Sequence, residues 1–180
     1  MGSKRTQKLL IGFVISLLII AVKTFLPPVK PSVSTQNVLS VNSSSSAVLK
    51  VIDGDTLDVS VNGAKTKVRI IGINTPETVD PRKSVECFGK EASDKAKSIL
   101  NGKSVILRND PTQSDKDKYG RVLRYVILPD GTDFGLLMIK GGYAYEYTYE
   151  VPYENQKLYK DAQRQAQTEK VGLWGDGICK

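Results

Sequence analysis

The 180-residue sequence contains no histidine. This absence excludes Ser-His-Asp triads, Cys-His dyads, HExxH zinc sites and other histidine-dependent metal centres. Acid–base chemistry must therefore come from Asp, Glu, Lys, Tyr or water. Cysteine is scarce as well, because Cys87 and Cys179 are the only two. The length allows one domain of ordinary size with appendages.

Acidic residues are absent before Asp53, whereas cationic residues occur from the start of the chain. The formal net charge is +7, and removing the five cations Lys4, Arg5, Lys8, Lys23 and Lys30 leaves +2 for the rest. Most of the basicity thus belongs to the amino-terminal stretch. Net charge is therefore weak evidence that the remainder binds a polyanion.

Residues 9–22 form an uncharged apolar run, LLIGFVISLLIIAV. About 14 apolar residues are few for a spanning helix and typical of the core of a signal peptide. No small-x-small cleavage site follows, however. If Lys23 snorkels, roughly 18 residues, from 9 to 26, suffice to span a bilayer.

We therefore expect residues 1–26 to be a signal-anchor or transmembrane segment. Its cationic flank would remain in the cytoplasm and place the rest outside, at the cell membrane. A cleaved signal, which would give a secreted protein, is the alternative. A buried helix of the domain fits poorly, because the run is apolar on all faces and ends at Pro27-Pro28.

Proline and serine dominate residues 27–46, PPVKPSVSTQNVLSVNSSSS. Nothing in this stretch is periodic enough to bury one face, so the composition predicts a disordered linker. The domain is expected to cover residues 47–180.

The stretch 51–78 combines acidic residues, an arginine and a predicted hairpin. Its turn is Asn62-Gly63, a dipeptide suited to two-residue turns with positive φ. Apolar and polar residues alternate on both sides of the turn, which places Arg69 on the strand face opposite Val68 and Ile70. The hairpin returns Glu77 toward Asp53 and Asp55. Carboxylates and an arginine at one end of a hairpin suggest a site for a hard metal and phosphate.

Short strands come first in the chain, and helices are interleaved later. The strands are expected at Ala47–Ile52, in the hairpin, at Ser104–Arg108 and at Arg121–Leu128, and the helices at Glu91–Leu100, Phe134–Lys140 and Tyr153–Glu169. Gly172-Leu173-Trp174 is expected to dock the end of the chain on the core. This order predicts a small α+β barrel.

Five short motifs occur along the chain. VIDGDT precedes Arg69, and NTPE, GKEAS, DKYGR and GLW follow it in that order. Together with Arg69 they resemble the staphylococcal nuclease (thermonuclease) family over about residues 47–174. The resemblance implies an OB-fold, a five-stranded β-barrel with three helices. It also implies calcium-dependent cleavage of DNA and RNA to 3′-phosphate and 5′-hydroxyl ends. With the amino-terminal segment, we expect a membrane-anchored or secreted bacterial homologue, and we expect it to be a monomer.

The resemblance also implies roles for individual residues. Asp55 falls on a calcium-binding carboxylate and Thr75 on a position whose backbone carbonyl binds calcium. Arg69 and Arg121 fall on the arginines that grip the scissile phosphate, and Glu77 on the usual general base. Lys118 and Tyr119 fall on nucleotide-phosphate contacts. This agrees with the chemistry, since Ca²⁺ takes oxygen ligands and guanidinium groups bind phosphate through two donors.

Asn74 departs from the family pattern, which has a calcium-ligating aspartate at this position. The amide still offers a carbonyl oxygen, but one negative charge is missing. We therefore predict weaker calcium binding through Asp55, Asn74 and Thr75. Sites of low ligand charge still bind calcium at roughly 10⁻⁴–10⁻³ M.

Tyr143, Tyr145, Tyr147 and Tyr149 alternate and would share one face of an extended segment. Such a face either packs on the last helix or stacks nucleic acid bases. The family has a Tyr-x-Tyr pair here, and Tyr147 and Tyr149 are the preferred match for substrate binding.

Cys87 and Cys179 form an even pair in a chain expected to be exported, which favours a disulfide over two thiols. The family prototype lacks cysteines and does not bear on this. A bridge would close a loop of about 90 residues and contribute on the order of 4 kcal/mol in the loop-entropy model.

A calcium-dependent nuclease is the leading functional hypothesis. A non-catalytic OB-fold module that binds nucleic acid or a protein is the main alternative, because such domains can keep the groove without the chemistry. An inert surface adhesin would explain the anchor and linker. The presence of Asp55, Arg69, Glu77 and Arg121 argues against both.

Overall fold

The computed structural model describes residues 45–78, 82 and 84–179. The predicted membrane segment and residues 27–44 of the predicted linker lie outside this part of the chain. Within the described residues, no helix combines the length and apolar character needed to cross a membrane.

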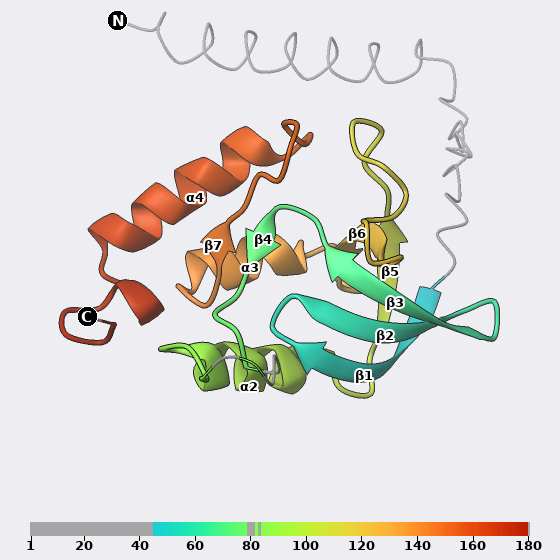
Figure 1. Ribbon diagram of the computed structural model, residues 1–180, viewed down its shortest axis with the longest axis horizontal. Helices are drawn as coiled ribbons and strands as arrows, with labels where there is room; N and C mark the ends of the chain where they lie inside the picture. Colours follow the sequence, from blue (N-terminus) through green and yellow to red (C-terminus); the bar gives the residue numbers. More distant parts are fainter. Residues whose placement is uncertain (1–44, 79–81, 83, 180) are drawn as a thin grey trace, which may run out of the picture. The chain divides into compact units, whose positions relative to one another are not determined.

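Five strands close into a barrel in the order β1-β2-β3-β6-β5. They are β1 (Ser45–Asp53), β2 (Thr56–Val61), β3 (Ala64–Ile70), β5 (Ser104–Arg108) and β6 (Val122–Ile127). Neighbouring strands are antiparallel except β3 and β6, which pair in parallel. The barrel and the three helices of the described part confirm the α+β OB-fold (Figure 1).

The predicted linker boundary was wrong by two residues. Ser45 and Ser46 belong to β1, where they pair with Ile106 and Val105 of β5. Ser46 is buried, with 3% of its surface exposed. A serine run carries no strand signal of its own, but the open edge of β5 supplies backbone partners that make it a strand.

The β2–β3 hairpin has the predicted two-residue turn. Asn62 and Gly63 both have positive φ, 51° and 81°. The register pairs Leu57 with Val68 and Thr56 with Arg69, so the alternating apolar residues enter the barrel. Asp58 departs from the simple alternation, because it is buried and pairs with Lys65 at 2.8 Å.

The helices are α2 (Gly89–Leu100), α3 (Phe134–Lys140) and α4 (Gln156–Thr168), followed by the 3₁₀ turn η1 (Gly172–Trp174). α3 has its predicted bounds, and Asp133 caps it by accepting a hydrogen bond from the Leu136 N–H. α2 begins two residues earlier than predicted. α4 begins three residues later, because Tyr153 leaves the helical path and enters the core.

Two short strands were not predicted. β4 (Ile73–Asn74) pairs with β7 (Tyr145–Glu146) in a separate two-stranded sheet. The predicted extended segment from Tyr143 to Tyr149 is therefore a strand over only two residues. β4 and β7 connect the barrel to the helical half of the domain (Figure 1).

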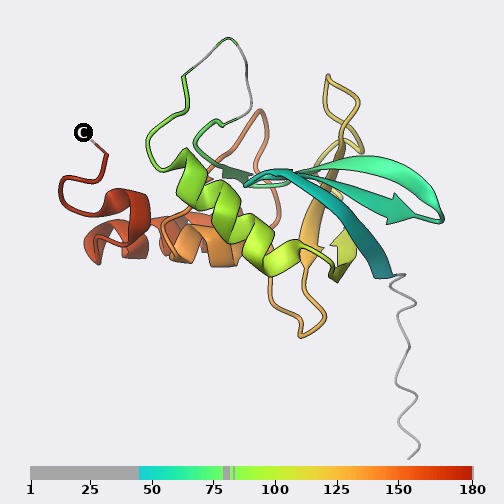
Figure 2. The ribbon, with the colours of Figure 1, turned by 90° about the horizontal axis from the view of Figure 1, so that it is seen from below.

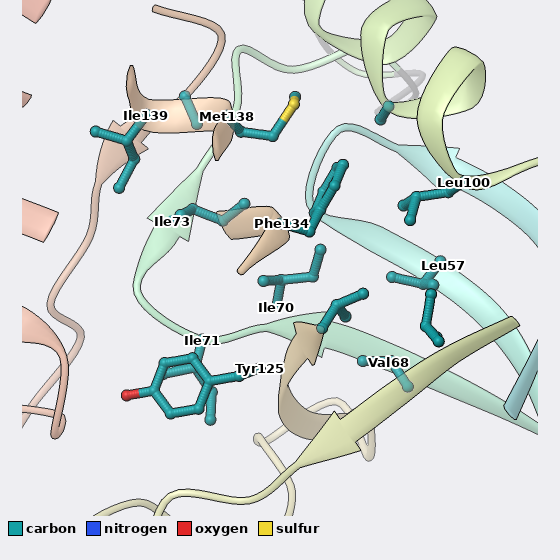
Figure 3. Packing of buried hydrophobic residues seen from close by; sticks show 14 of the residues in the cluster. Leu57, Val68, Ile70, Ile71, Ile73, Leu100, Tyr125, Phe134, Met138 and Ile139 are labelled. Atoms are coloured by element: carbon teal, nitrogen blue, oxygen red, sulfur yellow. The ribbon is translucent and has the colours of Figure 1, made fainter. Parts of the chain in front are cut away.

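One apolar core joins the barrel to its helices. Figure 3 shows Leu57, Val68 and Ile70 of the barrel clustered with Leu100 of α2 and Phe134 of α3. All five are at most 2% exposed. α2 runs alongside the strands in the second view (Figure 2). Truncating Phe134 to alanine would cost about 3–5 kcal/mol of unfolding free energy, since the cavity left cannot fully collapse.

Candidate active site

A pocket of about 620 Å³ opens between the ends of the barrel strands, the loop before β6 and the segment after β7. Every residue predicted to act in catalysis, metal binding or substrate binding lines it. These are Asp55, Arg69, Asn74, Thr75, Glu77, Lys118, Tyr119, Arg121, Tyr147 and Tyr149. The fold thus brings together residues that are up to 94 positions apart in the chain.

The turn between β1 and β2 carries Asp55 into the pocket. A Cβ on Gly54 would lie 2.6 Å from Cγ2 of Thr75, so only glycine lets this turn approach β4 so closely. Asp55 Oδ2 accepts hydrogen bonds from the Thr75 N–H at 2.9 Å and its hydroxyl at 3.2 Å. Thr56 donates to Oδ1 at 2.8 Å. The carboxylate is therefore held rigidly, with 6% of the residue exposed.

Arg69 projects from the end of β3 across the same turn. Its Nη1 donates to the carbonyl oxygens of Ile70 and Ile73, both at 2.7 Å. Its Nη2 lies 3.2 Å from Asp55 Oδ2 and donates to Asn74 Oδ1 at 3.2 Å. The guanidinium is thus fixed before any substrate enters, and it links the two side chains predicted to bind metal.

Glu77 lies just after β4 at the side of the pocket. The Thr78 N–H donates to Glu77 Oε1 at 2.8 Å. The Thr78 hydroxyl donates to Asp53 Oδ1 at 3.2 Å, so Thr78 connects the carboxylates of Glu77 and Asp53. The main chain of Glu77 is bonded to Glu86, which precedes α2.

The electrostatics of this side of the pocket suit a cation. Burial, together with the negative charges of Asp55 and Glu77, raises the pKa of Asp53 from 3.8 to about 6. Asp53 and Asp55 supply carboxylate oxygens, Asn74 an amide oxygen and Thr75 a carbonyl and a hydroxyl. Hard cations such as Ca²⁺ prefer this all-oxygen donor set.

A cation here would depend on more than acidic side chains. Among residues 45–78, 82 and 84–179, no group of three or more His, Cys, Asp or Glu is arranged to hold a metal. Neutral oxygens such as those of Asn74 and Thr75 would complete the ligand set. Asn74 thus offers a neutral oxygen where the resemblance implies an aspartate.

Arg121 reaches the pocket from a different part of the chain. It directly precedes β6, whose parallel pairing with β3 sets Val122 beside Val68. Asp117 Oδ2 accepts from Arg121 Nε at 2.6 Å, and Asp117 Oδ1 accepts from the Arg121 N–H at 3.0 Å. Burial alone would raise the pKa of Asp117, but these hydrogen bonds hold it below its usual value.

This contact sets the direction of the Arg121 guanidinium. Because Asp117 engages Nε, this contact leaves the terminal nitrogens of Arg121 able to donate to another group. The Arg121 guanidinium also lies 5.4 Å from the ring centre of Tyr119. A bidentate guanidinium fixed in this way matches the geometry of a phosphate.

Lys118 and three tyrosines form an exposed rim of the pocket. Lys118 Nζ lies 5.2 Å from the ring centre of Tyr119 and 5.9 Å from that of Tyr149. Electrostatic contact with Tyr119 and Tyr149 raises the pKa of Lys118. The rings of Tyr147 and Tyr149 pack with centres 6.4 Å apart.

The four alternating tyrosines divide into two pairs. Tyr143 packs on Phe88 at 5.6 Å, and Tyr145 packs on Trp174 at 5.3 Å. Tyr147 and Tyr149 line the pocket instead. The expectation of one common face does not describe this arrangement, because the strand that would maintain the alternation ends at Glu146.

Cys87 and Cys179 are joined by a disulfide, with Cα atoms 5.7 Å apart. The bridge ties the residue two positions before α2 to the end of the chain. It lies outside the pocket lining.

Sequence reasoning missed several residues that shape the site. Asp117 orients Arg121, and Tyr153 lines the pocket while donating to the carbonyl oxygen of Gly72 at 3.2 Å. Lys67 and Gln113 also line it. For Asp117 a signal existed, since an aspartate that starts the turn DKYGR can bond the chain four residues later. The other three have no local signal.

The comparisons with known proteins agree with this geometry. A family described as "Staphylococcal nuclease homologue" matches residues 67–176. The thermonuclease of Staphylococcus hyicus is 41% identical over 129 residues, which cover 72% of this chain and 75% of that protein. The thermonuclease of Staphylococcus intermedius is 39% identical over 127 residues, 71% of this chain and 74% of that protein.

A third relative is more distant. The endonuclease YncB of Bacillus subtilis (strain 168) is 34% identical over 126 residues, 69% of this chain and 59% of that protein. The family match at residues 67–176 includes Arg69, Glu77 and Arg121. The chain belongs to the staphylococcal nuclease family and is a nuclease.

Proposed function

We propose that this nuclease is calcium-dependent and hydrolyses phosphodiester bonds of DNA and RNA outside the cytoplasm, leaving 3′-phosphate and 5′-hydroxyl ends. The observation that carries the proposal is the composition of the single pocket described above. It combines oxygen ligands, two oriented arginines and a carboxylate base within reach of an aromatic rim.

Asp55, Asn74 and the Thr75 carbonyl would hold the calcium ion, and Asp53 lines the same pocket. Bound calcium supplies positive charge that offsets the negative charge of the phosphate and of the clustered carboxylates. The choice of calcium follows from the hard, all-oxygen donor set and from the resemblance to the family.

Glu77 takes the proton from the attacking water, because no histidine is available for this task. The water oxygen forms a bond to phosphorus while the bond from phosphorus to the 5′ oxygen breaks. The 5′ oxygen takes a proton from solvent water and leaves as a hydroxyl, and the phosphate stays on the 3′ side. Arg69 and Arg121 donate to the phosphate oxygens, on which negative charge accumulates in the transition state.

Tyr147, Tyr149 and Tyr119 would bind the nucleotides that flank the cleaved bond. Stacking on an aromatic ring tolerates any base, since every base has a flat π face. Lys118 would contact a phosphate beside them. A rim of this kind supports cleavage of both DNA and RNA without strong sequence preference.

The proposed location rests on the amino-terminal sequence and on the disulfide. Residues 9–26 would anchor the protein in the membrane, and the Cys87–Cys179 bridge is typical of oxidising compartments. We propose a monomer with the nuclease domain outside the membrane. Protease treatment of intact cells should remove the domain; protection of the domain would contradict this location.

The catalytic proposal is tested with the full chain in detergent. Labelled single-stranded DNA and RNA are incubated with calcium, with magnesium or with a calcium chelator. Cleavage should require calcium, and the ends should be 3′-phosphate and 5′-hydroxyl. Glu77→Gln should lower kcat by about 1,000-fold, within the range for loss of a general base.

The matched control is Glu91→Gln, which changes an exposed carboxylate on α2 and should retain activity. Cleavage that persists in chelator, or a Glu77→Gln variant as active as the wild type, would contradict the mechanism.

A further inference from the structure

Glu86, which lies just before α2, contacts the main chain of Glu77. The Glu86 N–H donates to the carbonyl oxygen of Glu77 at 2.9 Å. In the opposite direction, the Glu77 N–H donates to Glu86 Oε2 at 3.0 Å. Both bonds act on the main chain of Glu77, so the position of Glu86 determines where the Glu77 side chain starts.

The beginning of α2 is packed against the same residues. A Cβ on Gly89 would lie 2.8 Å from Cγ2 of Thr78 and 3.1 Å from the Glu77 carbonyl oxygen. The start of α2 therefore packs against Glu77 and Thr78 with no room for a side chain at residue 89. Phe88 adopts a positive φ of 65°, which is unusual for a bulky residue, and its ring packs on Tyr143.

The Cys87–Cys179 disulfide joins this segment to the end of the chain. Cys87 lies between Glu86 and Phe88, and its partner Cys179 is 92 positions away. The segment that carries Cys179 is itself fixed, because the Leu173 N–H donates to the Gly142 carbonyl oxygen at 2.9 Å. The bridge thus connects the end of the Glu77 segment to an anchored part of the domain.

We propose that the Cys87–Cys179 disulfide and Glu86 position Glu77, so that full nuclease activity requires the bridge. This rests on the role of Glu77 in the proposed function. Neither the bridge nor Glu86 lines the pocket, and both are positioning residues that act through the Glu77 main chain. Without the bridge, only noncovalent contacts of exposed residues such as Glu86 hold the segment before α2 against Glu77. Such contacts open more readily than a covalent link.

The first test leaves the bridge intact. Glu86→Ala removes the acceptor of the Glu77 N–H, whereas Glu86→Gln keeps an oxygen there. With the full chain, single-stranded DNA and saturating calcium, Glu86→Ala should lower kcat by about 10-fold with KM unchanged, since a shift of about 1 Å in a reacting group can cost 100-fold. Glu86→Gln should restore kcat to the wild-type value.

The second test removes the bridge through Cys87→Ser combined with Cys179→Ser. At a temperature well below the unfolding midpoint of this variant, kcat should again fall by about 10-fold with KM unchanged. Asp176→Ala is the matched control. It breaks the exposed Lys170–Asp176 ion pair near the same chain end but retains the disulfide, and it should keep wild-type kinetics.

A double-mutant comparison separates positioning from general loosening of the fold. In the Glu77→Gln background, removing the cysteines should not lower kcat further, because the positioned group is already missing. A further loss of the same size, an unchanged kcat in the cysteine variant, or an effect on KM alone would overturn the proposal. An active Glu77→Gln variant would instead overturn the proposed function itself.

Discussion

The two sides of the pocket differ in how firmly their side chains are held. On the acidic side, Asp55 and Thr75 are 6% and 4% exposed and bond to each other and to Arg69. On the aromatic rim, Tyr119 and Tyr149 are 72% and 59% exposed. The first set is organised before substrate arrives, whereas the second is shaped mainly by packing between rings and Lys118.

This difference predicts that the acidic side affects kcat and the aromatic rim affects KM. Groups that are fixed and partly removed from water stabilise charge that develops in the transition state, and their loss should appear in kcat. Exposed rings contribute to binding of substrate and transition state alike, and their loss should appear in KM. Four substitutions test this prediction through kcat, KM and the calcium dependence of activity.

Arg69→Lys should have the largest effect. A lysine keeps the charge but cannot reproduce the planar set of donors that contacts Ile73, Asn74 and Asp55. We expect kcat to fall by about 1,000-fold with a small change in KM, as for loss of a transition-state donor. Steady-state kinetics on single-stranded DNA measure this. Arg108→Lys, in an exposed pair with Glu154, is the control.

Asp117→Ala tests whether Arg121 also has to be oriented. Without the aspartate, the Arg121 side chain loses its bond at Nε, and we expect kcat to fall by about 50-fold because the donors are no longer aligned. Asp115→Ala is a matched control, since Asp115 pairs with Arg124 at 2.6 Å in the same loop. Equal losses in the two variants would show that the loop, rather than the orientation of Arg121, matters.

Asn74→Asp adds a charge on the acidic side. The added carboxylate should lower the calcium concentration for half-maximal activity by about 10-fold, because calcium affinity rises with the charge of its ligands. Calcium titrations of activity, together with calorimetry on the full chain, give this value. An unchanged calcium dependence would show that residue 74 is not a ligand.

Tyr149→Ala tests the rim and should have the smallest effect. Loss of one stacking ring is worth about 1 kcal/mol, so KM should rise about fivefold while kcat stays the same. Tyr149→Phe keeps the ring and should bind substrate as the wild type does. If Tyr149→Ala lowered kcat instead, the proposed separation between the two sides would not hold.

The local elements of the site could be predicted, whereas the contacts between distant segments could not. The Asn62-Gly63 turn and the alternation in β2 and β3 are determined by neighbouring residues, and the structure has both. Asp117 contacts Arg121 four positions away and had a local signal, whereas Tyr153 and Glu86 contact segments that only folding brings beside them. The pairing of β4 with β7, which separates Tyr145 from Tyr147, likewise has no pattern in either two-residue strand.

By itself, the sequence determined that Asp55, Arg69 and Glu77 lie at one end of a hairpin and that no histidine takes part. Strand period and turn geometry act over a few residues, so a short stretch suffices to specify them. Only the tertiary structure decided that Arg121 joins them, that Tyr147 and Tyr149 face the pocket, and that Glu86 contacts the main chain of Glu77. Those placements depend on closing the barrel and burying one shared core, and this requires the whole domain at once.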